Sequence, residues 1–168
     1  MSATPWRGRP RLAWLTAVAI LLALDQLSKA WFASTIALGT AVEVTSWFNL
    51  VHVLNTGAAF SLLADAGGWQ RVFFIVIGFM VVAPITFFCL ARQVAPIERV
   101  AGALIVAGGG GNLIDRFANG AVTDFLDLHW RSLHWPAFNL ADVFIVLAAA
   151  VWIWMSFRPV AATMESPS

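Results

Sequence analysis

The chain has 168 residues, of which 60% are apolar and 11% are charged, whereas a soluble domain usually has about 25% charged residues. So few charges cannot cover a soluble surface, which indicates a chain that lies in lipid. The formal net charge of +1 gives no reason to expect a nucleic-acid partner. The single cysteine, Cys89, excludes an intramolecular disulfide, and its apolar surroundings predict a buried thiol.

Four apolar stretches are long enough to cross a bilayer as helices. About 20 helical residues span the hydrocarbon core, because each residue rises about 1.5 Å. We therefore predict an all-α membrane protein, a bundle of four transmembrane helices in a single domain over residues 1–168. The predicted spans are residues 12–34, 70–91, 97–116 and 138–157. The tail at 161–168 is predicted to be disordered.

The distribution of basic residues predicts how these helices are oriented. Arginines precede the first span, lie between the second and third, and follow the fourth. The connection 35–69 has no Lys or Arg, and 117–137 has only Arg131. Since positive residues favour the cytoplasm, both termini are expected inside and both long connections outside. Asp25 and Lys29 interrupt the first stretch without a cleavage site, so we expect a retained span rather than a signal peptide.

The first outer connection, residues 41–63, is predicted to contain short strands. Val42 and Val44 alternate with other residues, and further β-branched residues follow the Trp47–Phe48 pair. A turn is predicted directly after these residues, at 55–57. The sequence thus favours a small β-rich unit outside the helical bundle.

Ionisable side chains interrupt the apolar stretches, where burial in lipid is costly and therefore points to a function. Asp25 and Lys29 are four residues apart, so they share one helix face, and Lys29 is the only lysine. A purely structural ion pair explains these two residues equally well. The same structural explanation stays open for Asp115 at the end of the third stretch.

Four consecutive glycines, residues 108–111, lie in the third stretch. Small residues allow helix backbones to approach closely, which predicts a tight helix crossing at this point. No Gly-Lys-Ser/Thr sequence follows, so the glycines do not form a phosphate-binding loop. Asn112 and Arg116 come next, four residues apart, and are predicted to face the same way.

Two further aspartates flank the start of the fourth stretch. Asp124 follows the third span, and Asp142 comes shortly after Pro136 and Asn139, which favour a helix start and its cap. An acid in the first turn of a helix is stabilised by about 0.3–1 kcal/mol through the helix dipole. This simpler explanation does not account for the deeply apolar sequence that follows Asp142.

The predicted topology brings these polar residues into one layer near the outer surface. Asp124 and Asp142 fall in that layer, together with Asp25, Lys29, Asn55, Asn112 and Arg116. Two neighbouring carboxylates cannot both ionise cheaply, so they share a proton. One can then activate water as a base while the other protonates or polarises a carbonyl. Such a pair hydrolyses an amide without a metal, a cofactor or a covalent intermediate.

Other catalytic machinery is hard to find in the sequence. No His-Glu-x-x-His motif occurs, and His52, His129 and His134 lack zinc-binding spacing, so no metal is expected. No Gly-x-Ser-x-Gly elbow is present. Cys89 is predicted near the opposite end of its helix from the polar layer, which argues against a cysteine nucleophile.

Five sequence blocks together resemble bacterial lipoprotein signal peptidase, the signal peptidase II family. The blocks are residues 24–29, 55–60, 111–116, 122–125 and 138–142. Their order and spacing match over roughly residues 12–157, which is far more specific than any single block. One departure is that Gly109 and Gly110 stand where the family often has alanine and a bulkier residue. This departure affects the expected packing of the third helix more than the chemistry.

The resemblance implies an aspartic endopeptidase of the bacterial cytoplasmic membrane, with the outer strands forming a small extracytoplasmic β-cradle. It implies hydrolysis of prolipoproteins immediately before a diacylglyceryl-modified cysteine, with Asp124 and Asp142 as the catalytic pair. Matching positions that would bind substrate or support the site are Asn55, Gly57, Asn112, Arg116, Asn139, Asp25, Lys29 and Asp115. The expected partners are these prolipoproteins, membrane lipids and globomycin-type inhibitors, and we expect a monomer.

Two other functions stay open from the residues alone. A small proton-coupled transporter would use buried charges such as Asp25, Lys29 and Asp142 as a relay. However, the inner half of the predicted bundle offers no matching set of polar residues. A non-catalytic membrane scaffold would use the aspartates only as helix caps and ion-pair partners.

Overall fold

The computed structural model describes residues 9–57 and 69–157. In these residues the chain forms four helices and a small antiparallel sheet, as predicted. The helices are α1 (Arg9–Thr35), α2 (Trp69–Ala91), α3 (Pro96–Asn119) and α4 (Leu140–Ser156). The strands are β1 (Ala41–Thr45), β2 (Phe48–Asn55), β3 (Val122–Trp130) and β4 (Leu133–His134). The predicted tail at 161–168 and residues 58–63 of the outer connection lie outside the described residues.

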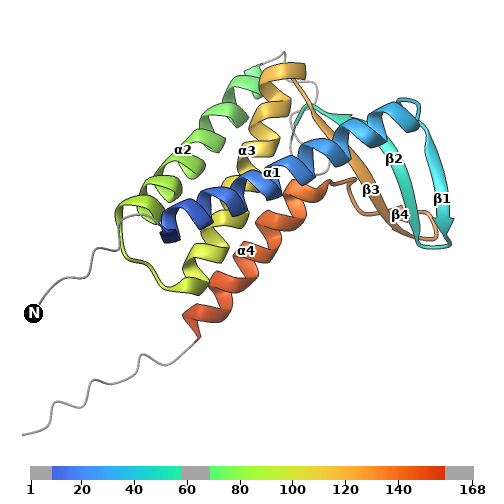
Figure 1. Ribbon diagram of the computed structural model, residues 1–168. Helices are drawn as coiled ribbons and strands as arrows, with labels where there is room; N and C mark the ends of the chain where they lie inside the picture. The colour runs from blue at the N-terminus through green and yellow to red at the C-terminus, as the bar shows by residue number, and fades with distance from the viewer. Residues whose placement is uncertain (1–8, 58–68, 158–168) are drawn as a thin grey trace, which may run out of the picture.

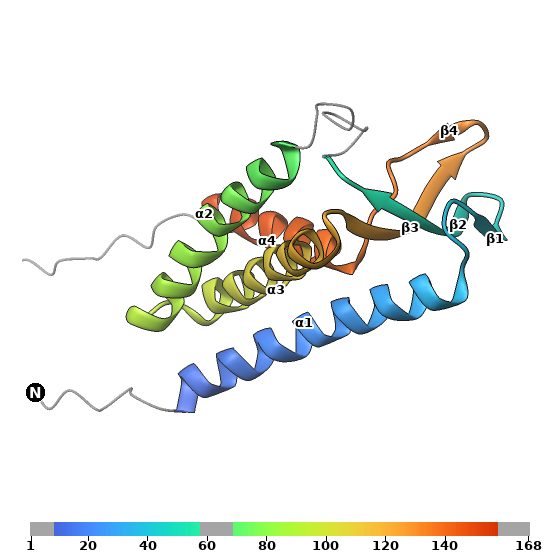
Figure 2. The same ribbon diagram turned by 90° about the horizontal axis from the view of Figure 1, so that it is seen from above.

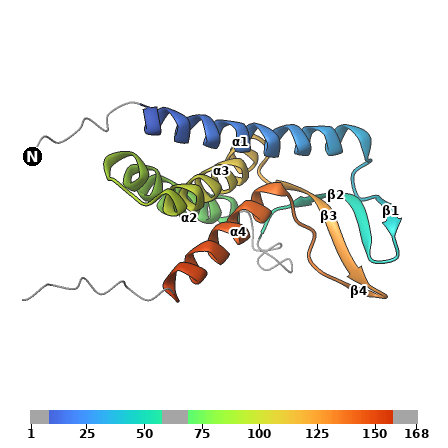
Figure 3. The ribbon, with the colours of Figure 1, turned by 60° about the horizontal axis from the view of Figure 1, so that its bottom comes forward.

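The helices and the sheet occupy different ends of the molecule. Figure 1 shows the sheet beyond one end of α2, α3 and α4, with the last part of α1 running beside it, while the start of α1 and the end of α4 lie toward the other end. Helix α3 packs against each of the other three helices. Figures 2 and 3 show α1 on one side of α3, with α2 and α4 toward the other. α3 is therefore the element through which the helices are held together.

Glycines of α3 allow its neighbours to approach closely, which confirms the predicted tight crossing. A Cβ atom added at Gly108 would meet the carbonyl oxygen of Ala141 on α4, and one added at Gly111 would meet the carboxylate of Asp25 on α1. A Cβ added at Gly110 would instead have ordinary contact, 3.6 Å from the nearest atom. The unusual Gly110 is thus not required by packing, whereas Gly108 and Gly111 are.

The helix lengths support the predicted spans only in part. Pro10–Thr35 and Trp69–Ala91 are long and apolar enough to cross a membrane, by length and composition. α4 is apolar but has 17 residues, starting two residues later than predicted. α3 continues past the predicted end at 116 as far as Asn119, where Gly120 at φ 77° ends it in the left-handed conformation that glycine adopts readily.

The sheet has the strand order β1-β2-β3-β4, and all its pairs are antiparallel. β1 and β2 lie within the predicted β-rich connection 41–63. β3 and β4 lie in 117–137, for which the sequence predicted only a connection. The first four residues of β3 are buried, so this strand lacks the apolar–polar alternation that reveals a half-exposed strand.

Candidate active site

Asp124 and Asp142 come from different elements, β3 and α4. The chain before α4 is held along β3, because Leu126 and Phe138 exchange two backbone hydrogen bonds of 2.9 and 3.0 Å. α4 therefore starts beside the strand that carries Asp124. Asn139 caps the helix: its side-chain oxygen accepts the N–H of Asp142 at 3.2 Å, and its own N–H donates to the Asp142 carboxylate at 3.1 Å. The predicted cap is confirmed.

Asparagine side chains link Asp124 and Asp142, which we call the acid pair. The amide nitrogen of Asn139 donates to Asp124 Oδ1 at 2.7 Å, so the residue that caps Asp142 also holds Asp124. Asn55 donates to the other oxygen of Asp124 at 3.0 Å. Asn112 donates to Asp142 Oδ1 at 2.9 Å. Each acid is thus held by uncharged amide donors, and Asn139 contacts both.

Backbone groups determine which way two of these amides face. The side-chain oxygen of Asn139 accepts the N–H of Asp142, and that of Asn55 accepts the N–H of Gly57 at 3.0 Å. Because an amide oxygen only accepts and its NH₂ group only donates, both NH₂ groups are left to face Asp124. Their orientation therefore follows from the backbone rather than from the acid itself.

Asp124 can hold a proton near neutral pH. Asp124 is only 2% exposed, and its pKa is raised to about 7. The larger cause is this burial, and the second is the negative charge of Asp142. Hydrogen bonds from Asn55 and Asn139 oppose that rise. Asp142 is only partly buried and lines a groove. The two carboxyl groups therefore differ in their surroundings: Asp124 is buried, and Asp142 faces the groove.

Asp25, Lys29 and Asp115 form a second group, which we call the lysine cluster. The Lys29 ammonium lies 2.9 Å from a carboxylate oxygen of Asp25 and 2.9 Å from one of Asp115. The predicted ion pair of Asp25 with Lys29 is therefore present, and Asp115 joins it. Gln26 donates to both carboxylates at 3.1 Å. Sequence reasoning did not select Gln26, although its polar side chain interrupts an apolar stretch and it lies in the block 24–29.

The lysine cluster also ties α1 to the start of α4 and to β3. Asp25 accepts the N–H of Ala141 at 2.9 Å, and Asp115 accepts the N–H of Thr123 at 3.3 Å. Ala141 and Thr123 are the residues next to Asp142 and Asp124 in the chain. The cluster thus fixes the backbone on which the acid pair stands.

A groove of about 550 Å³ opens at Asp142, one member of the acid pair. Its polar end contains Asn55, Gly57, Arg116 and Asp142, and its apolar flank includes Val143, Val146 and Leu147 of α4. Arg116 donates to the carbonyl oxygen of Gly57 at 3.1 Å and lies over the ring of Phe74, 4.9 Å from its centre. Arg116 therefore holds the first outer connection at the rim of the groove.

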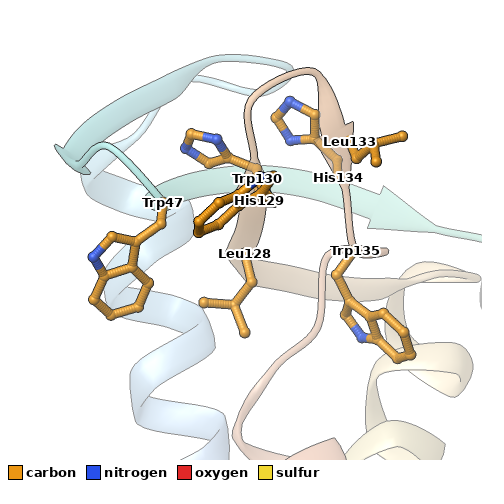
Figure 4. Close-up of a pocket in the computed structure, with 7 residues that line it drawn as sticks. All are labelled: Trp47, Leu128, His129, Trp130, Leu133, His134 and Trp135. Carbon is orange, nitrogen blue, oxygen red and sulfur yellow. The ribbon is translucent and has the colours of Figure 1, made fainter.

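A second hollow, of about 590 Å³, lies on the sheet and is lined mainly by aromatic residues. Figure 4 shows Trp47, Leu128 and Trp135 pointing to the same side of the sheet. Leu128 and Trp135 also line the groove, so the two hollows are neighbours. The rings of His129 and His134 are stacked 5.0 Å apart. No carboxylate lines this hollow in the described structure, whereas Asp142 lines the groove.

All ten predicted site residues fall in the described structure. Asp124, Asp142, Asn55, Asn112 and Asn139 form the acid pair and its amide donors. Asp25, Lys29 and Asp115 form the lysine cluster, and Gly57 and Arg116 form the rim. Among residues 9–57 and 69–157, no group of three or more His, Cys, Asp or Glu side chains could hold a metal ion.

Comparison with known proteins identifies the family. The signal peptidase (SPase) II family model matches residues 17–158. The chain belongs to this family. The lipoprotein signal peptidase of Aeromonas hydrophila subsp. hydrophila is 46% identical over 149 residues, covering 88% of this chain and 89% of that protein. The lipoprotein signal peptidase of Serratia marcescens is 47% identical over 141 residues, covering 84% and 82%.

Solved structures agree with this family assignment. A bacterial membrane enzyme determined by the in meso method at 2.3 Å resolution has a TM-score of 0.78 and 26% identity, covering 93% of this chain and 94% of its own. A second, at 1.9 Å resolution, has a TM-score of 0.75 and 27% identity, covering 88% and 94%. The resemblance predicted from five sequence blocks is confirmed, and the chain is an integral membrane protein.

Proposed function

We propose that this chain is an aspartic endopeptidase that removes signal peptides from prolipoproteins, with Asp124 and Asp142 acting together on a water molecule. Membership of the signal peptidase II family and the names of its relatives support the peptidase activity and the substrate. They give no support to the proton-coupled transporter. The observation that supports the catalytic assignment most directly is the contact of Asn139 with both acids.

The two acids have different parts in the proposed reaction. Asp142 faces the groove from the first turn of α4, where a helix N-terminus favours a negative charge. It takes a proton from water as the water oxygen attacks the peptide carbonyl. Asp124, whose pKa of about 7 keeps a proton available at neutral pH, donates that proton to the carbonyl oxygen.

Breakdown of the tetrahedral intermediate reverses these proton transfers. The carbon–nitrogen bond breaks as Asp142 gives its proton to the leaving amine. Asp124 recovers a proton from the intermediate's hydroxyl group, which becomes the carbonyl of the new carboxyl group. The acid pair therefore returns to its starting state without a metal or a covalent intermediate.

The shape of the groove suits a substrate that is embedded in lipid. Val146 and Leu147 on the apolar flank are 67% and 50% exposed, so an apolar signal peptide could lie along α4 and reach Asp142. We assign the scissile bond to the position immediately before a diacylglyceryl-modified cysteine, whose acyl chains stay in the lipid beside the groove. Globomycin-type inhibitors would occupy the same groove.

We place the protein in the bacterial inner membrane, with both termini in the cytoplasm and the sheet forming a cradle outside. The arginine distribution supports this orientation, as does the position of the start of α1 and the end of α4 away from the sheet (Figure 1). Membrane lipids would surround the helices. Both acids come from one chain, so a monomer is sufficient.

Cysteine labelling tests this orientation. In a Cys89→Ala background, Ser46→Cys should react with a membrane-impermeant maleimide from outside intact cells.

The direct test is cleavage of a diacylglyceryl-modified prolipoprotein by Asp124→Asn and Asp142→Asn variants. Each should lose about 100- to 10,000-fold in kcat, because general acid–base catalysis contributes that much. Ser34→Ala, on the exposed end of α1, is the matched control and should retain the parent rate. Full turnover by both Asn variants would contradict the assignment, and solute flux in proteoliposomes would favour a transporter instead.

A further inference from the structure

Asn112 differs from the other two asparagines at the acid pair in what holds its amide. In Asn139 and Asn55 the side-chain oxygen accepts a backbone N–H. The side-chain oxygen of Asn112 instead accepts the Lys29 ammonium at 3.0 Å, with a longer contact of 3.3 Å from Asn139. The orientation of this amide therefore depends mainly on another side chain.

We propose that Lys29 is a positioning residue for the acid pair: it holds the Asn112 amide so that its NH₂ group donates to Asp142. This inference rests on the proposed function. An ammonium group has three N–H donors and no acceptor, so only the oxygen of Asn112 can face it. The NH₂ group is then directed to Asp142 Oδ1, 2.9 Å away. A turned amide would place NH₂ against the ammonium and an oxygen against the carboxylate.

The position of Lys29 is itself tightly fixed. Its side chain is 4% exposed and contacts Asp25, Asp115 and Asn112 at 2.9, 2.9 and 3.0 Å. These three acceptors match the three donors of the ammonium group, so none is left over. Gln26 holds both carboxylates from the other side. Lys29 thus has one arrangement available, and that arrangement determines how Asn112 faces.

Lys29 is not among the residues that line the groove. It therefore has no direct contact with a substrate bound there. Its hydrogen-bonded route to the reaction passes through Asn112 and Asp142, while its positive charge also acts on Asp124 through space. Loss of such a residue should reduce kcat and leave KM nearly unchanged, because the interaction it supports matters for the chemical step. A residue that only stabilised the fold would reduce the amount of folded enzyme but leave kcat per folded molecule unchanged.

The substitution must avoid leaving two uncompensated carboxylates in the bundle. Lys29→Met combined with Asp115→Asn removes one positive and one negative charge together, and it is compared with Asp115→Asn alone. Relative to Asp115→Asn, the double variant should lose about 10- to 100-fold in kcat per folded molecule, since small misplacements at a reacting centre cost that much. Its KM for the prolipoprotein should change by less than about twofold.

The same comparison in an Asn112→Ala background tests whether Lys29 acts through Asn112. If it does, removing Lys29 should reduce kcat much less once the amide is absent than when it is present. An equal loss of kcat with and without Asn112 would overturn the inference. If the Met variant fails to fold, Lys29→Gln replaces it, because a glutamine amide can face Asn112 with either end and so leaves it unfixed.

The outcome for Asp142→Asn separates this inference from the proposed function. Retained cleavage by Asp142→Asn would refute the catalytic role proposed for Asp142 and, with it, this inference. An inactive Asp142→Asn together with independent effects of Lys29 and Asn112 would refute the inference alone.

Discussion

Two pairs of aspartates lie close together in this protein, and they differ in what stands between their carboxylates. Between Asp25 and Asp115 stands a lysine, whose ammonium contacts both at 2.9 Å. Asp124 and Asp142 are joined by uncharged amides, and no lysine or arginine hydrogen-bonds to either in the described residues. A cation allows two buried acids to ionise together, whereas amides leave them competing for a proton. The first pair is therefore suited to structure and the second to catalysis.

The two pairs also differ in their access to substrate. Asp25 is fully buried between α1 and α3, against Gly111. Asp142 lines the groove, while Asp124 is buried directly behind the amides that link it to Asp142. Similar residues are thus suited to different roles because the fold places a lysine in direct contact with both acids of one pair and gives the other pair an opening.

Replacing one aspartate of each pair by asparagine should produce the largest difference between the two pairs. Asp142→Asn should lose about 1,000-fold in kcat with stability changed by no more than about 1 kcal/mol, the usual size of a helix-dipole effect. Asp25→Asn should be destabilised by about 3 kcal/mol, because its new NH₂ group faces the donors of Lys29 and Gln26.

Thermal unfolding in detergent and cleavage rate per folded molecule measure these two effects separately. The folded fraction of Asp25→Asn should retain a substantial part of the parent kcat. A stable but inactive Asp25→Asn would show that the lysine cluster takes part in the chemistry and would remove the contrast.

Two neighbouring glycines test how closely the lysine cluster is packed. Gly111→Ala should be destabilised by about 1–3 kcal/mol, the usual cost of overpacking, since its Cβ would collide with the Asp25 carboxylate. Gly110→Ala should be neutral or stabilised by up to about 1 kcal/mol, because its Cβ meets only ordinary contact. Unfolding temperatures of the two variants give the comparison, and equal values would contradict this packing.

Removal of one amide donor from the acid pair should have a smaller effect on activity. Asn55→Ala removes the hydrogen bond to Asp124 Oδ2 and should reduce kcat about 10-fold, as expected for the loss of one hydrogen bond worth about 1–1.5 kcal/mol. The matched control is Asn49→Ala, which removes a similar amide contact, of 2.9 Å, to Asp127 elsewhere on the sheet. Similar kcat losses in both variants would indicate a general effect on the sheet.

Much of the site could be predicted because lipid makes polar residues conspicuous. Asp25, Lys29, Asn112 and Asp142 interrupt apolar stretches, and the predicted helix ends place them in one layer. Asn139 was recognisable as a cap because it precedes an apolar helix after a proline. These features are local, so the sequence alone reveals them.

Other features depend on contacts between distant segments and could not be predicted. β3 is buried at its start, so no alternation marks it as a strand, and Asp124 was expected in a connection. Gln26 acquires its role only when α3 brings Asp115 beside it. The orientation of the Asn112 amide likewise depends on Lys29, which is 83 residues away in the chain.

The pH dependence of kcat/KM tests most directly whether the acid pair shares a proton. Because the raised pKa of about 7 keeps Asp124 protonated below that pH, the rate should fall as the pH rises through about 7. Because two interacting acids titrate in two coupled steps, the rate should also fall at low pH, where the pair binds a second proton, and the profile should be bell-shaped. A profile with a single ionisation, measured on a diacylglyceryl-modified prolipoprotein, would contradict the shared proton.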